Sequence, residues 1–166
     1  MTQALAPPFL VASLVLCVAG AFKLRSPRTA ASALGIPERL VRALSVGEII
    51  LGAACALHPT RALALALALV YQLFAGVAVV LKRRRVACGC FGDNDIPVSP
   101  AHVIASELLG AVAVAAAIAS PRGLSWVADQ PPAASVVLAL GVAGAVYATV
   151  LVFTGLPRAW TAWSGE

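Results

Sequence analysis

Residues 62–81 read ALALALALVYQLFAGVAVVL, an apolar run without a charged side chain that ends directly at the basic residues Lys82-Arg83-Arg84-Arg85. This run has the length of about 20 residues with which an α-helix crosses the hydrocarbon core of a bilayer. Because that core holds no water, a spanning segment must satisfy its own backbone hydrogen bonds, as a helix does. The run therefore predicts a membrane-spanning helix.

The rest of the chain has the same character. Of its 166 residues, 61% are hydrophobic and 11% are charged, whereas about 25% are charged in an ordinary soluble domain. Further runs with the length and hydropathy of a span lie at about residues 5–22, 40–57, 103–119 and 134–156. We expect residues 1–166 to form one all-α transmembrane domain, a bundle of about five helices, with four as the alternative count and no extramembrane catalytic domain.

Basic residues lie at the ends of the apolar runs. With five spans, ten of the twelve Lys and Arg residues fall on one side of the membrane, and only Arg61 and Arg122 fall on the other. The positive-inside rule then places the N-terminus outside, and the C-terminus and the link after residue 81 inside. Residues 1–8 carry no Lys or Arg, so we interpret the first run as an uncleaved helix rather than a signal peptide. The net charge of +5 thus reflects helix orientation, not a nucleic-acid partner.

The motif Cys88-Gly89-Cys90-Phe91-Gly92 follows the third span and is where we expect chemistry. Two cysteines separated by one glycine can close a disulfide, bind a soft metal ion or exchange thiols with a partner. A ring closed within Cys-Gly-Cys is small and strained, and strain makes a disulfide more oxidising. We predict Cys88 and Cys90 to be catalytic thiols, and we predict no cofactor. The open alternatives are a metal-binding pair, a purely structural loop disulfide and two inert thiols.

Charged side chains inside the spans are the second candidate feature. Lys23, Glu48 and Glu107 fall at similar depths from the basic side. Pairing Lys23 with one or both glutamates would lower the cost of burying them. We predict a polar cluster that supports the Cys-Gly-Cys loop or relays protons, with a purely structural ion pair as the alternative. Cys17 and Cys55 lie inside apolar runs and are either small buried side chains or secondary thiols that carry electrons onward.

Polar and small residues within the spans indicate how the helices pack. We expect Gln72 and Tyr147 to form hydrogen bonds between helices. Small residues let helix backbones approach closely, a role that we assign to Gly47, Gly52, Gly141 and Gly144.

Three parts of the sequence together carry a family resemblance: Ala19-Gly20-Ala21-Phe22-Lys23-Leu24, Glu48, and Cys88-Gly89-Cys90-Phe91-Gly92. With these the chain resembles the MauE family, the methylamine utilisation membrane proteins, which are grouped with DoxX-like redox-associated membrane proteins. The resemblance implies a multi-pass protein of the bacterial cytoplasmic membrane that works beside a thioredoxin-like redox protein in disulfide formation or maturation of an exported substrate protein. In the namesake the beneficiary is the small subunit of methylamine dehydrogenase.

The function that these features predict is thiol–disulfide exchange, in which one thiolate attacks a partner disulfide and the other resolves the mixed disulfide. An exported partner requires thiols outside, whereas the charge asymmetry places Cys88 and Cys90 inside. Two other functions stay open. The first is a soft-metal carrier that moves an ion past Glu48 and Glu107, and the second is a non-catalytic assembly subunit whose cysteines are dispensable.

Overall fold

The computed structural model describes residues 2–84, 98–120 and 122–155 of the chain. Five of its helices are long and apolar enough to cross a membrane, which confirms the predicted all-α bundle. Within the described ranges the elements are η1 (Thr2–Leu5), α1 (Ala6–Arg25), α2 (Pro27–Leu34), α3 (Glu38–Leu57), α4 (Arg61–Arg84), α5 (Pro100–Ala119), α6 (Leu124–Ala128) and α7 (Pro132–Thr154).

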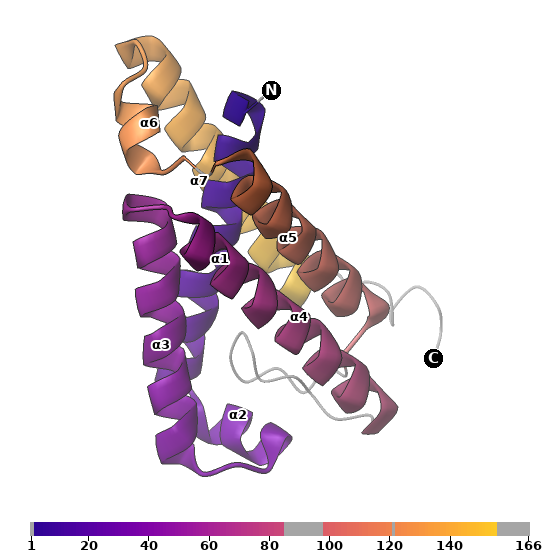
Figure 1. Ribbon diagram of the computed structural model, residues 1–166. Coiled ribbons are helices and arrows are strands. Elements are labelled where there is room, and N and C mark those ends of the chain that lie inside the picture. The colour runs from indigo at the N-terminus through magenta and orange to yellow at the C-terminus, as the bar shows by residue number, and fades with distance from the viewer. Residues whose placement is uncertain (1, 85–97, 121, 156–166) are drawn as a thin grey trace.

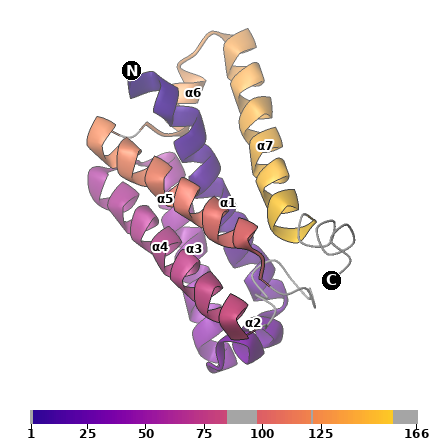
Figure 2. The ribbon, with the colours of Figure 1, turned by 90° about the vertical axis from the view of Figure 1, so that its right-hand side faces the viewer.

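The spanning helices pack as two pairs joined along α1. Helix α1 lies against α3, α4 lies against α5, and α7 packs on α1 and α5 (Figures 1 and 2). The short helix α2 lies at one end of the bundle and α6 at the other (Figure 1). Because successive spans run in opposite directions, α4 ends and α5 begins at the α2 end.

Two glycines allow the close approach of α1 and α3. A Cβ atom at Gly52 would lie 2.5 Å from the carbonyl oxygen of Ser13 and 2.6 Å from the Sγ atom of Cys17. A Cβ atom at Gly20 would lie 2.7 Å from the carbonyl oxygen of Ser45. Only a hydrogen atom fits at either position, so the two glycines fix how closely these helices pack.

The packing role that the sequence predicted holds for Gly52 but not for the other three glycines. Among the described residues, no atom lies within 4 Å of a Cβ placed at Gly47, Gly141 or Gly144. Gly20, which was not predicted to pack, takes the second close contact. A glycine's spacing along one helix does not reveal which side of that helix faces its neighbour.

Hydrogen bonds connect α4 to α5 and to α1. The Gln72 amide donates to Glu107 Oε2 on α5 at 2.9 Å, which confirms the predicted bond from Gln72 to another helix. The buried hydroxyl of Tyr71 donates to the carbonyl oxygen of Ala12 on α1 at 2.6 Å. Tyr147, which we expected to bond between helices, is instead 66% exposed on α7. Tyr71 is the tyrosine that joins two helices.

The short helix α2 was not predicted as a separate element. It spans Pro27–Leu34 and is capped by Gly35, whose φ of 68° is a left-handed conformation that glycine adopts without strain. Its last residue, Leu34, packs against a small cluster of Ala78, Leu81 and Val98. Helix α2 therefore holds the end of α4 and the residues before α5 together.

Candidate functional site

The predicted catalytic thiols, Cys88 and Cys90, lie outside the described residues, as do Gly89, Phe91 and Gly92 of the motif. The structure does describe the chain on both sides of residues 85–97. Leu81, near the end of α4, and Val98, just before α5, belong to the same buried cluster. The two ends of the link are therefore held together at the α2 end of the bundle.

Helix α5 begins with a capping box that positions a histidine. The backbone N–H of Ser99 donates to His102 Nδ1 at 3.3 Å, and the Ser99 hydroxyl lies 3.1 Å from the same nitrogen. The His102 ring also makes an edge contact with Phe153 on α7, with a distance of 5.4 Å between ring centroids. The ring is thus fixed between the start of α5 and the end of α7.

Lys23 and Glu48 form a buried ion pair between α1 and α3. The distance from Lys23 Nζ to Glu48 Oε1 is 2.5 Å, and the two side chains are 9% and 10% exposed. Lys23 Nζ also lies 4.3 Å from the ring centroid of Phe74 on α4, in the geometry of a cation–π contact. Among the described residues, Glu48 Oε2 has no hydrogen-bond partner although it is buried. One carboxylate oxygen of Glu48 therefore pairs with Lys23, while the hydrogen-bonding capacity of the other oxygen is unsatisfied among the described residues.

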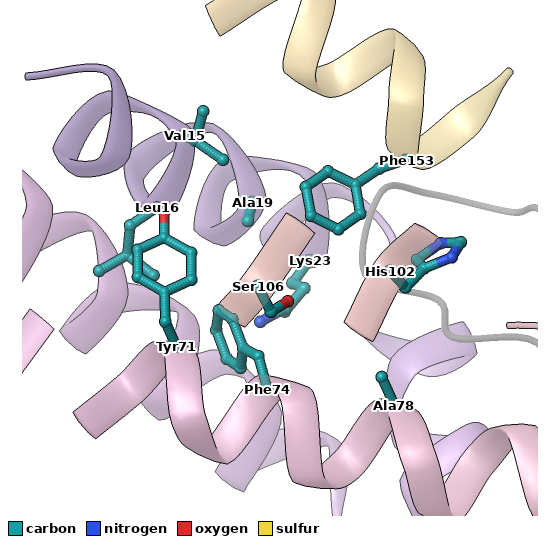
Figure 3. A pocket seen from close by; sticks show the side chains of 10 residues that line it. All are labelled: Val15, Leu16, Ala19, Lys23, Tyr71, Phe74, Ala78, His102, Ser106 and Phe153. Carbon is teal, nitrogen blue, oxygen red and sulfur yellow. The ribbon is translucent and has the colours of Figure 1, made fainter. Parts of the chain in front are cut away.

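An internal cavity of about 30 Å³ lies beside this pair, between α1, α4, α5 and α7 (Figure 3). Its polar lining comes from Lys23, His102, Ser106 and Tyr71, and the rest of its wall is apolar. A cavity of this size has room for a water molecule, which needs about 10–15 Å³. Ala78 lines the cavity and also belongs to the cluster that joins the end of α4 to the residues before α5, so the cavity lies toward the α2 end.

The contribution of Ser106 was not predicted, and His102 was not assigned to this site. Their spacing in the sequence could have indicated that they share a site, because His102, Ser106, Gly110 and Ala113 recur at helical intervals. In the structure all four are buried. Residues four apart lie on one face of a helix, so the two polar side chains enter the bundle together.

Glu107 lies apart from the Lys23–Glu48 pair. It is exposed on the surface shared by α4 and α5, where it accepts the hydrogen bond from Gln72. The predicted cluster thus divides into two contacts, Lys23 with Glu48 and Glu107 with Gln72. A role of either contact in thiol chemistry stays a prediction.

Cys17 and Cys55 lie in the packed interface of α1 and α3. The Cys17 thiol lies 3.5 Å from the Ile49 carbonyl oxygen, and the fully buried Cys55 thiol lies 3.4 Å from that of Leu63. Cys55 is two residues before the end of α3, at the end of the bundle opposite α2. Their environment is that of small packing side chains, and a role as secondary thiols stays a prediction.

Comparison with known proteins gives one match. A family model described as Methylamine utilisation protein MauE matches residues 2–120, which include α1 to α5 and the Cys-Gly-Cys motif. No curated protein and no solved structure matches the chain.

Proposed function

Since the chain belongs to the family of methylamine utilisation protein MauE, as the match over residues 2–120 shows, we propose that it is a membrane-embedded thiol–disulfide exchange protein. Cys88 and Cys90 are its exchanging thiols, and a thioredoxin-like redox protein is its direct partner. Its task is disulfide formation or maturation of an exported protein. In the family's namesake that protein is the small subunit of methylamine dehydrogenase, and the substrate of this chain is left open.

One observation carries the proposal. The sequence puts its closest pair of cysteines into the link between two spans, residues 85–97. The described residues on either side of this link pack together at the end of the bundle toward which a buried ion pair and a small cavity lie. Charged and polar groups are expensive inside a membrane and are usually kept there for a task. Lys23, His102 and Ser106 at the α2 end support a role in holding or moving protons beside the thiols.

The exchange transfers two electrons from a dithiol to a disulfide. In the oxidising direction, a thiolate of the reduced partner attacks the Cys88–Cys90 disulfide and forms a mixed disulfide, which releases the other cysteine as a thiolate. The partner's second thiolate then attacks the partner's first sulfur in the mixed disulfide. This closes an intramolecular disulfide in the partner and releases the second cysteine of the Cys-Gly-Cys pair as a thiolate. The partner is oxidised and the Cys-Gly-Cys pair is reduced by the same two electrons.

The test is thiol labelling combined with trapping of the mixed disulfide. A membrane-impermeant maleimide is applied to intact cells and to inverted vesicles, with and without prior reduction. We expect Cys88 and Cys90 to label only after reduction, and we expect Cys88→Ser or Cys90→Ser to accumulate a reductant-sensitive adduct with a thioredoxin-like protein. Cys17→Ser with Cys55→Ser is the matched control, which should leave the adduct of the single variants unchanged.

Two results would replace this proposal with its alternatives. Thiols that label under all conditions and are protected by Cu(I) or Zn(II) would indicate the soft-metal carrier. A Cys88→Ser, Cys90→Ser variant that complements a deletion as well as the unaltered protein does would indicate the assembly subunit.

A further inference from the structure

A groove of about 460 Å³ lies between α2, α3 and α4, separate from the internal cavity. Leu44, Leu73 and Val77 line it and are exposed within membrane-spanning helices, so the groove faces the hydrocarbon of the bilayer. Its volume is within the range of about 300–1,000 Å³ that small-molecule sites occupy. A ligand would therefore reach it from the lipid phase.

Among the described residues that line the groove, Lys23 and Glu48 are the ones with polar side chains. Their opposite charges cancel, so the site offers little attraction to the anionic head group of a lipid. Lys23 Nζ has three hydrogen-bond donors, of which one is used on Glu48 Oε1, while Glu48 Oε2 has no partner among the described residues. A donor and an unsatisfied acceptor thus lie side by side in apolar walls.

We propose that this groove binds a lipid-soluble quinone, with the ring at Lys23 and Glu48 and the tail toward the bilayer. A quinone ring is neutral and flat, and each of its oxygens is an acceptor in the oxidised form and a donor in the reduced form. A carbonyl oxygen accepts a hydrogen bond from Lys23 Nζ, and a quinol hydroxyl donates to Glu48 Oε2 once that carboxylate turns toward the groove. The ring of Phe74 provides an aromatic wall beside Lys23.

This inference rests on the proposed function for its chemical purpose. Closing the Cys88–Cys90 disulfide breaks two S–H bonds, forms one S–S bond and releases two electrons and two protons. Reducing a quinone to a quinol takes up the same two electrons and two protons and forms two O–H bonds. Lys23 and Phe74 line both the groove and the cavity of Figure 3, so the groove adjoins the cavity that lies toward the end of the bundle where α4 ends and α5 begins.

Gly47 supplies a variant that blocks the groove without disturbing the helix interface. It lines the groove, and a Cβ atom there meets no described atom within 4 Å. Gly47→Phe therefore places a ring in the space of the ligand. Gly144→Phe on α7 is the matched control, because Gly144 is equally open and does not line the groove. Val77→Phe fills the groove from its α4 wall, and it is the second blocking variant in case Gly47→Phe does not fold.

The experiment measures binding in phosphatidylcholine nanodiscs. A photoactivatable azidoquinone is crosslinked to the purified full chain, its site is mapped by mass spectrometry, and its Kd is obtained by competition with ubiquinone carrying one isoprene unit. We expect crosslinks on α3 and α4, and a Kd that Gly47→Phe and Val77→Phe raise by at least about tenfold while Gly144→Phe does not. Crosslinks that ubiquinone fails to displace, or equal Kd values for all three variants, would overturn the quinone site.

The Cys88→Ser, Cys90→Ser variant separates this inference from the proposed function. It retains the groove and should bind the azidoquinone as the unaltered chain does, even if the thiols prove to have no role in exchange. If the single cysteine variants trap a partner but the unaltered chain binds no azidoquinone, the quinone site is wrong and the proposed thiol–disulfide exchange still holds.

Discussion

At the scale of single residues, burial decides what an ion pair contributes. The Lys23–Glu48 pair and the Arg42–Glu38 pair have the same N–O distance of 2.5 Å. Arg42 is 61% exposed, so water and salt screen its pair, whereas the side chains of Lys23 and Glu48 are about one tenth exposed inside a spanning bundle. The Arg42–Glu38 pair therefore contributes little to stability. In the Lys23–Glu48 pair, removing either side chain would leave the other charge buried without its partner.

We therefore expect Lys23→Met to lower the free energy of unfolding by about 3 kcal/mol, because it leaves the Glu48 carboxylate buried without its partner. The double variant Lys23→Met, Glu48→Leu should recover most of this loss, since it removes both charges. Arg42→Met is the control and should change stability by roughly 0.5 kcal/mol or less. Denaturant titration of the purified protein in detergent micelles measures all three. A double variant as unstable as the single one would show that the two charges are not coupled.

At the scale of helices, the sequence predicted well where each span lies along the chain, and poorly which side of each helix faces the bundle. The predicted and observed spans agree to within a few residues, because length and hydropathy suffice to locate them. Glu48 and Glu107 were predicted to belong to one polar cluster, yet Glu48 is buried in the bundle and Glu107 is exposed on its surface. Ser106 is buried while the next residue, Glu107, is exposed, and a step of one residue turns a helix by about 100°. That rotation depends on packing between helices, which no single segment reveals.

The α1–α3 interface gives the prediction at this scale. We expect Gly52→Ala to destabilise the protein by about 1–3 kcal/mol, because the added methyl group would overlap the Ser13 carbonyl oxygen and the Cys17 thiol. Gly47→Ala, five residues away on the same helix, should be neutral or stabilising by up to about 1 kcal/mol, since alanine favours helix and the position is open. Thermal unfolding in detergent compares the two variants. Equal midpoints would mean that α1 and α3 do not approach closely at Gly52.

At the scale of the whole molecule, the charge distribution and the proposed function favour opposite orientations of the protein in the membrane. Lys23, Arg25, Arg28 and Lys82 to Arg84 gather at the α2 end, and Arg61 and Arg122 lie at the α6 end. The small cavity is toward the α2 end, and residues 85–97, which contain Cys88 and Cys90, connect α4 to α5 at that end. The positive-inside rule assigns that end to the cytoplasm, while maturation of an exported protein takes place outside. A quinone in the groove would let the thiols exchange electrons with the bilayer whichever side they face.

Reporter fusions decide the orientation. We expect alkaline phosphatase, which is active only outside the cytoplasmic membrane, to be active when fused after Thr60 and inactive when fused after Arg84, because ten of the twelve Lys and Arg residues lie on the side of Arg84. Green fluorescent protein, which folds in the cytoplasm, should give the reverse pattern at the same two positions and controls for expression. Phosphatase activity after Arg84 alone would place the Cys-Gly-Cys link outside. The thiols could then meet an exported thioredoxin-like partner directly, and the basic residues at the α2 end would need another role, such as binding anionic lipid.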